Sequence, residues 1–258
     1  DPMWRAEAAS ILQPVYDLQS DWESAVRALE ILAASESDVA ARVALLTRVG
    51  DVCGTLLGDP ARAFDAYGRA FRDAPADEAL TDTLLAAAEA VGAWDRVSAL
   101  FREAATRYDG TALGRSLWLR VADVEGRRRG DLGAAVGALE HLLAVDAGDL
   151  DALTVLEGAY VAAGRWHEAL GVMRRRYDQL SDPDAQREVL ARIAETHREK
   201  LGDAEAAVNT WREALGRDPT DTEALAALDA LLEGLGRWQE LAENLNVQLG
   251  LAGTPEDE

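Results

Sequence analysis

The residue types that most often carry catalysis are few in this chain and do not cluster. The three histidines are His141, His167 and His197, and His167-Glu168 lacks the second histidine that a zinc-protease helix places four residues later. Cys53 is the single cysteine, and it lies among apolar residues without a base nearby, so we expect a small buried side chain. There is no Walker-type glycine loop and no GxSxG elbow. We therefore predict that the chain is not an enzyme and has no catalytic residue, cofactor or metal.

Arginine is the one side chain of this kind that recurs at a regular spacing. Arg48, Arg120 and Arg192 are equally spaced along the chain. Guanidinium groups bind carboxylates strongly, so a row of them would attract an acidic segment. Each arginine is also followed three positions later by an aspartate or glutamate, which on a helix would form an ion pair with it. Two interpretations stay open: a binding row, or arginines neutralised on their own helices.

Two independent markers recur at the same interval as these arginines. The pair Gly58-Asp59 is repeated as Gly130-Asp131 and as Gly202-Asp203. Tryptophan recurs in the same way, as Trp22, Trp94, Trp166 and Trp238. The chain therefore has a period of about 72 residues.

Each period contains two repeating units. A glycine lies two residues before each of the last three tryptophans, and it divides the period into a short and a long part. The short part has about 34 residues and the long part about 38 residues. The repeating unit is therefore about 36 residues long, and short and long units alternate.

Each unit has the pattern of two helices joined by a turn. Val189, Ile193 and Thr196 follow helical spacing, and no segment alternates with a period of two over the length of a strand. We predict that Gly202 ends a first helix in the left-handed conformation and that Asp203 caps the second. The repeated tryptophans are expected to pack, largely buried, at the start of each second helix.

The second helices resemble those of the tetratricopeptide repeat family. That helix carries alanine, a large apolar or aromatic residue four positions later, alanine three positions after that, and then proline. Two units have the full pattern, as Ala63, Tyr67, Ala70 and Pro75 and as Ala207, Trp211, Ala214 and Pro219. Degenerate versions cover nearly the whole chain, and the long units exceed the family length by about one helical turn. The resemblance implies an all-α, right-handed superhelical solenoid of about seven helix-turn-helix repeats, of the kind found in large bacterial proteins.

We expect one solenoid over residues 6–250. Residues 1–5 are interpreted as residues left from cloning or as a linker, and residues 251–258 as an acidic tail. The array starts and ends on the same half-block without an evident polar capping helix, so end-to-end self-association is also expected. The seven units are predicted at residues 6–40, 41–77, 78–110, 111–149, 150–182, 183–221 and 222–250.

The resemblance also implies that the first helices of the units line a concave groove. It places the arginine row in that groove, together with three further cations two turns along the same helices. The predicted groove residues are Arg48, Arg120, Arg127, Arg128, Arg192 and Lys200. We predict a protein–protein interaction scaffold that binds a partner peptide or helix there. The alternatives are a regulatory or assembly segment of a larger multidomain bacterial protein, or an accessory module of an enzyme.

The formal charge of −21, from 47 acidic and 26 basic residues, argues against nucleic acid as the main ligand. Nucleic acid requires a basic surface, so we predict no nucleic-acid partner. No apolar run is long enough to cross a bilayer, and the first residues lack the pattern of a signal peptide. The partner is expected to be a protein or peptide. The sequence does not identify the compartment, although the cytoplasm is favoured.

Overall fold

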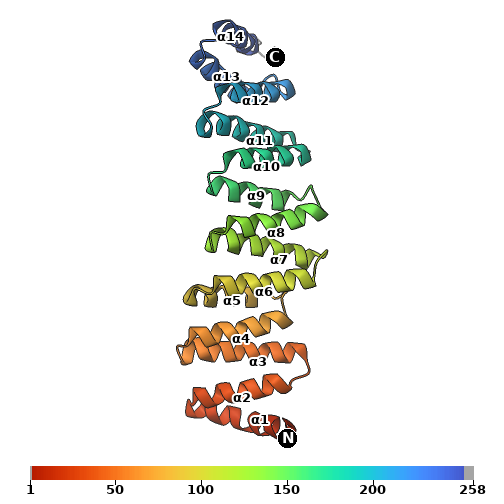
Figure 1. The fold of residues 1–258 in the computed structure, drawn as a ribbon, viewed down its shortest axis with the longest axis vertical. Helices are drawn as coiled ribbons and strands as arrows, with labels where there is room; N and C mark the ends of the chain where they lie inside the picture. Colours follow the sequence, from red (N-terminus) through yellow and green to blue (C-terminus); the bar gives the residue numbers. More distant parts are fainter. Residues whose placement is uncertain (1, 253–258) are drawn as a thin grey trace, which may run out of the picture. The chain divides into compact units, whose positions relative to one another are not determined.

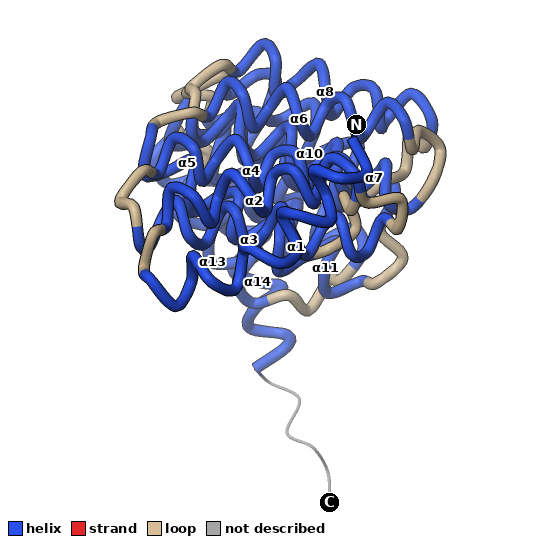
Figure 2. The backbone as a smooth tube through the Cα atoms, turned by 90° about the horizontal axis from the view of Figure 1, so that it is seen from below, coloured by secondary structure: helices blue, strands red, loops and turns tan. Residues whose placement is uncertain are grey.

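The computed structural model describes residues 2–252, which form fourteen α-helices and no β-strand. Figure 2 shows these helices joined by short loops. The order and lengths of the helices are those of about seven helix pairs, which confirms the all-α repeat fold. The helices are α1 (Pro2–Gln19), α2 (Trp22–Ser35), α3 (Val39–Asp51), α4 (Pro60–Asp73), α5 (Glu78–Val91), α6 (Trp94–Arg107), α7 (Ala112–Asp123), α8 (Leu132–Val145), α9 (Leu150–Ala162), α10 (Trp166–Gln179), α11 (Pro183–Glu195), α12 (Ala204–Arg217), α13 (Thr222–Gly234) and α14 (Trp238–Ala252).

The chain forms two compact units, residues 1–138 and 139–258, and α8 crosses the boundary. Within each unit consecutive helices follow one another in a row (Figure 1). In the first unit α1, α3, α5 and α7 are the first helices of their pairs, and α2, α4 and α6 are second helices. In the second unit α9, α11 and α13 are first helices, and α10, α12 and α14 are second helices. A single solenoid over residues 6–250 stays a prediction.

Local capping signals explain where the helices begin and end. Aspartate is the residue before most helices, and the carboxylate of Asp203 accepts the backbone N–H of Ala206 at 2.9 Å. Gly202 has φ of 67°, in the left-handed region that a glycine adopts without steric cost. The predicted Gly202-Asp203 turn is therefore confirmed, and Gly58 and Gly130 have the same conformation at the equivalent turns.

The first helices of the long pairs end in a π-helical turn. These turns are η1 (Val52–Leu56), η2 (Val124–Arg128) and η3 (Thr196–Lys200), which begin one period apart. In the first of them the backbone N–H of Leu57 donates to the carbonyl of Val52 at 3.0 Å, five residues earlier. The extra length of the long units therefore lies in a widened turn at the end of the first helix.

At both ends of the described chain, residues predicted to lie outside the solenoid are helical. Helix α1 begins at Pro2, so residues 2–5 are helical, whatever their origin, and Pro14 lies inside the same helix. Helix α14 includes the first two residues of the predicted acidic tail. The rest of that tail, residues 253–258, lies outside the described residues.

Aromatic side chains fill the space between neighbouring second helices. Phe64, Phe71 and Phe101 are almost completely buried. The rings of Phe71 in α4 and Phe101 in α6 have centroids 5.3 Å apart, so they join two consecutive pairs. Burying one such side chain stabilises the fold by about 2 kcal/mol. Contacts between neighbouring pairs therefore help to hold the stack together.

Gly50 permits the close approach of α3 and α4, because a Cβ there would overlap the ring of Tyr67. Tyr67 is buried, and its hydroxyl donates to the carboxylate of Asp51 at 2.9 Å, so the ring cannot easily move. We expect Gly50→Ala to lower the free energy of unfolding by about 1–3 kcal/mol, measured by urea denaturation. Gly54→Ala is the control, because its Cβ would meet Ala63 at 3.4 Å, and it should not lower stability. An unchanged Gly50→Ala protein would show that these helices can separate without cost.

Candidate partner-binding surface

The first-helix face is the surface of each unit that its first helices form. Ion pairs between neighbouring first helices define it. In the first unit Arg48 of α3 lies 3.9 Å from the Asp17 carboxylate of α1, and Arg120 of α7 pairs with Glu78 of α5. These side chains are partly exposed, up to 73% for Glu78. Exposed pairs contribute only about 0–1 kcal/mol each, so they join helices without holding them tightly.

Arg192, the third arginine of the row, has a different environment. Its partner is Glu157 of α9, whose side chain is only 2% exposed. Arg176 of α10 also donates to that carboxylate, at 2.8 Å, and its own side chain is 17% exposed. The Glu157 cluster, formed by Glu157, Arg176 and Arg192, therefore joins three helices around a buried charge. The arginines that are alike in the sequence are not alike in the structure.

The interpretation in which these arginines pair within their own helices is wrong. The packing places a carboxylate of the preceding first helix against each guanidinium. Meanwhile Asp51 accepts the Tyr67 hydroxyl, and Asp123 pairs with Arg127 at 3.1 Å. Arg127 is the most exposed of the predicted groove arginines, with 82% of its side chain accessible.

The last two predicted groove cations contact the repeated tryptophans. The guanidinium carbon of Arg128 lies 4.8 Å from the centre of the Trp94 ring, and Arg128 also pairs with Glu89 at 3.0 Å. Lys200 lies 5.6 Å from the centre of the Trp166 ring. Both tryptophans begin second helices as predicted, and both have an intermediate exposure. The reason is that each ring packs beside a cation near the surface.

Sequence reasoning missed a second buried carboxylate, Glu125, which is 1% exposed. It accepts the hydroxyl of Ser98 and a hydrogen bond of 3.0 Å from Arg102, and it pairs with Arg129. The residue one period earlier is Cys53, so the repeat register identifies this as a buried position. The burial expected for Cys53 therefore predicts, through the repeat, that Glu125 is buried too.

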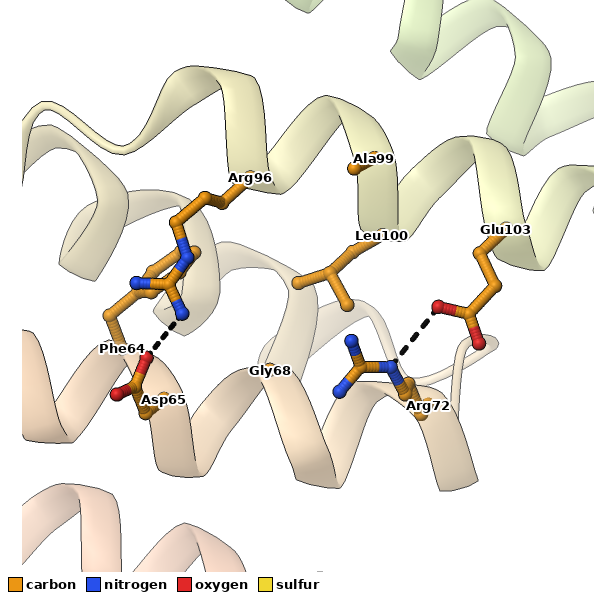
Figure 3. A pocket seen from close by; sticks show the side chains of 8 residues that line it. All are labelled: Phe64, Asp65, Gly68, Arg72, Arg96, Ala99, Leu100 and Glu103. Carbon is orange, nitrogen blue, oxygen red and sulfur yellow. Dashed lines mark hydrogen bonds and ion pairs between the residues drawn. The ribbon is translucent and has the colours of Figure 1, made fainter.

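A small pocket of about 210 Å³ lies between second helices α4 and α6 (Figure 3). Apolar side chains line its middle, and an arginine–carboxylate pair lies at each end. Because both arginines are already paired, the pocket offers no free charge to a ligand. Its lining residues are Phe64, Asp65, Gly68, Arg72, Arg96, Ala99, Leu100 and Glu103.

Ion pairs also shift the pKa of exposed acids. Hydrogen bonds from Arg237 and Arg212 lower the pKa of Glu240 to about 2, so this carboxylate stays ionised at neutral pH.

The described residues contain no group of three or more histidine, cysteine, aspartate or glutamate side chains that could hold a metal ion. No described helix is long and apolar enough to span a membrane.

The sequence of residues 152–188 matches the tetratricopeptide repeat family. Within this segment the chain is similar to one tetratricopeptide repeat. The match covers α9, α10 and the start of α11, and the repeated helix pairs extend a tetratricopeptide-like fold to the rest of the described residues. No curated protein matches the sequence.

Several solved structures are similar to this chain. The structure of Naa15/Naa10 bound to HypK-THB matches with a TM-score of 0.54 and 16% identity, over 88% of this chain and 34% of that chain. MamA matches with a TM-score of 0.37 and 13% identity, over 80% of this chain and 97% of that chain. YrrB, a TPR protein with an unusual peptide-binding site, matches with a TM-score of 0.39 and 16% identity, over 71% and 90%. At 16% identity, the similarity to the Naa15/Naa10 structure shows the fold alone.

The Glu157 cluster predicts unequal effects of arginine removal. We expect Arg176→Ala to lower the free energy of unfolding by about 3 kcal/mol, because it removes the less exposed partner of a buried carboxylate. Arg192→Ala should cost less, since Arg176 stays against Glu157. Arg69→Ala is the control, because its pair with Glu30 is exposed, and it should cost about 0.5 kcal/mol or less. Thermal and urea denaturation would measure all three, and equal effects would contradict a special role for the buried charge.

Proposed function

We propose that this chain is a protein–protein interaction scaffold that binds a peptide or helix of a partner along the first-helix face. The observation that carries the proposal is that Arg48 and Arg120 each pair with an acid of the preceding first helix while they remain partly exposed. Stacked repeats present extended surfaces of this kind, which suit long segments of a partner. No catalytic step is part of the proposal.

Arg48 and Arg120 are the cations best placed to receive carboxylates of the partner. Their pairs with Asp17 and Glu78 are partly exposed, so a partner's carboxylate can replace either acid at little cost. Arg127, which is more exposed still, can take part in the same way. Two parallel hydrogen bonds from one guanidinium to one carboxylate would orient the bound segment.

The remaining predicted groove cations have structural partners. Arg192 is held by the buried Glu157, and Arg128 and Lys200 lie against tryptophan rings. The net charge of −21 opposes an acidic ligand at long range. We therefore propose weak binding that depends on the local exchange of ion pairs on the first-helix face.

Titration of labelled peptides tests this proposal. A glutamate-rich peptide should bind more tightly than a lysine-rich peptide of equal length, and binding should weaken with added salt because ions screen the charges. Arg48→Ala combined with Arg120→Ala should weaken the glutamate-rich peptide about fivefold, as expected for two exposed charge pairs. Fluorescence anisotropy would measure the binding.

The matched control is Arg62→Ala combined with Arg69→Ala. These arginines form exposed pairs between second helices, with Glu23 and Glu30, and so remove the same charge from another surface. The control should bind the peptide like the wild type. Equal losses in both double variants would indicate a general charge effect, and tighter binding of the lysine-rich peptide to the first-helix face would contradict the proposal.

A further inference from the structure

A cavity of about 240 Å³ lies in the second unit, between the end of α10, the start of α11 and the end of α12. It is larger than the roughly 150 Å³ that holds a benzene ring in an engineered protein cavity. Leu190 and Ala214 are buried apolar parts of its wall, and Pro183 is a third apolar residue. The cavity therefore has room for a small organic group against an apolar surface.

Tyr177 of α10 also lines the cavity, and it is only 4% exposed. Among the described residues its buried hydroxyl has no hydrogen-bond partner. Because an unpartnered buried hydroxyl costs free energy, such groups are nearly always hydrogen-bonded in folded proteins. A ligand in the cavity that accepts a hydrogen bond would satisfy this hydroxyl.

Arg217, in the last turn of α12, is the second group of the wall that lacks a partner. Its guanidinium carbon lies 5.8 Å from the centre of the Tyr177 ring, and it forms no ion pair within residues 2–252. The other cation of the wall, Arg187, lies 3.8 Å from the carboxylate of Asp184. The cavity thus has one unpaired guanidinium beside one unpaired hydroxyl.

The remaining aspartates of the wall already accept local hydrogen bonds. Asp218 accepts the backbone N–H of Thr220 at 2.9 Å and its hydroxyl at 2.7 Å, which lowers the pKa of Asp218. Asp221 caps α13 and accepts the backbone N–H of Ala224 at 3.1 Å. The groups of the wall that lack a partner are therefore donors, which favours an acceptor as the ligand.

The first unit shows what occupies the equivalent place in another pair of the repeat. Arg42 and Asp73 form an ion pair of 2.7 Å there, from the start of α3 to the end of α4. Gln186 and Arg217 follow these two residues by two full periods. Gln186 is neutral and donates to the carbonyl of Leu180 at 2.6 Å, while an arginine replaces the aspartate. The guanidinium of the second unit thus lacks the carboxylate that the first unit supplies.

We propose that this cavity binds a carboxylate that carries a small apolar group. The carboxylate accepts hydrogen bonds from Arg217 and from the Tyr177 hydroxyl, and the apolar group lies against the wall that includes Leu190. Charge-assisted hydrogen bonds of this kind are strong and directional. The excess of acidic residues opposes anions at long range, so the binding is weak and local. A free organic acid and a glutamate side chain of a partner share this chemistry.

Fluorobenzoate, followed by fluorine NMR, is the probe because it combines a carboxylate with an aromatic ring. We expect saturable binding to the wild type, and much weaker binding of fluorobenzamide, which has a similar shape without the charge. Arg217→Ala should weaken fluorobenzoate binding at least about fivefold, and Tyr177→Phe about threefold. Arg175→Ala is the matched control, because this exposed arginine of α10 lies outside the cavity, and it should bind like the wild type.

Two variants separate binding from folding. Tyr177→Phe removes a hydroxyl that has no partner, so the unliganded variant should unfold at the same temperature as the wild type or at a higher one. Gln186→Arg combined with Arg217→Asp copies the pair of Arg42 and Asp73 into the second unit. This double variant should lose fluorobenzoate binding while circular dichroism shows that it remains folded.

The proposal would be overturned by no saturable binding of fluorobenzoate, by equal binding of fluorobenzamide, or by unchanged binding in the Arg217→Ala protein. The Arg48→Ala, Arg120→Ala protein should bind fluorobenzoate like the wild type, which separates this site from the first-helix face. An equal loss in that protein would count against the cavity as the site. In the same protein, displacement of fluorobenzoate by a glutamate-rich peptide would identify a partner's side chain as the natural carboxylate. Retention of the probe would identify a free acid, and both results support the carboxylate site.

Discussion

A helix pair of this chain cannot cover its own apolar surface, and every other feature depends on the neighbour that covers it. The stacked rings of Phe71 and Phe101 show this contact between two consecutive pairs, 5.3 Å apart at their centres. Gly50 shows the tight packing that such stacking requires within a pair, because no larger side chain fits against Tyr67. The same dependence explains α14, where the residues that are buried in earlier pairs are exposed.

Ion pairs add a second level of order to the stack. They join first helices to first helices, as between Arg48 and Asp17, and second helices to second helices, as between Arg62 and Glu23. Most are exposed and contribute little to stability, but they position arginines beside acids of the neighbouring pair. Most arginines pair with acids of the same chain. Because the chain has 47 acidic and 26 basic residues, an excess of carboxylates remains. A partner that approaches the chain therefore meets a negative field.

Equivalent positions of the repeat carry chemically different side chains. Cys53, Glu125 and His197 occupy one such position, in the π turns. Glu125 is buried and pairs with Arg102 and Arg129, whereas burial lowers the pKa of His197. Because the backbone repeats while these side chains differ, binding properties belong to individual pairs and not to the fold as a whole.

The sequence alone predicted the period, the helix pairs and their turns. Tryptophans begin the second helices, and the Gly202-Asp203 turn has the predicted conformation, because capping and helical spacing are local properties of the chain. The six groove cations could be named from the sequence, but whether they contact a partner stays a prediction.

Only the tertiary structure decided what each cation touches. Arg48 pairs with Asp17 and not with Asp51, and Arg192 reaches the buried Glu157, because carboxylates far away in the sequence are brought close by stacking. The exposure of Trp238 was equally hidden, since a tryptophan at a repeated position has the same local sequence signal whether or not a neighbouring helix covers it. Spacing along the chain determines which residues share a helix face, and the packing of successive pairs determines what that face meets.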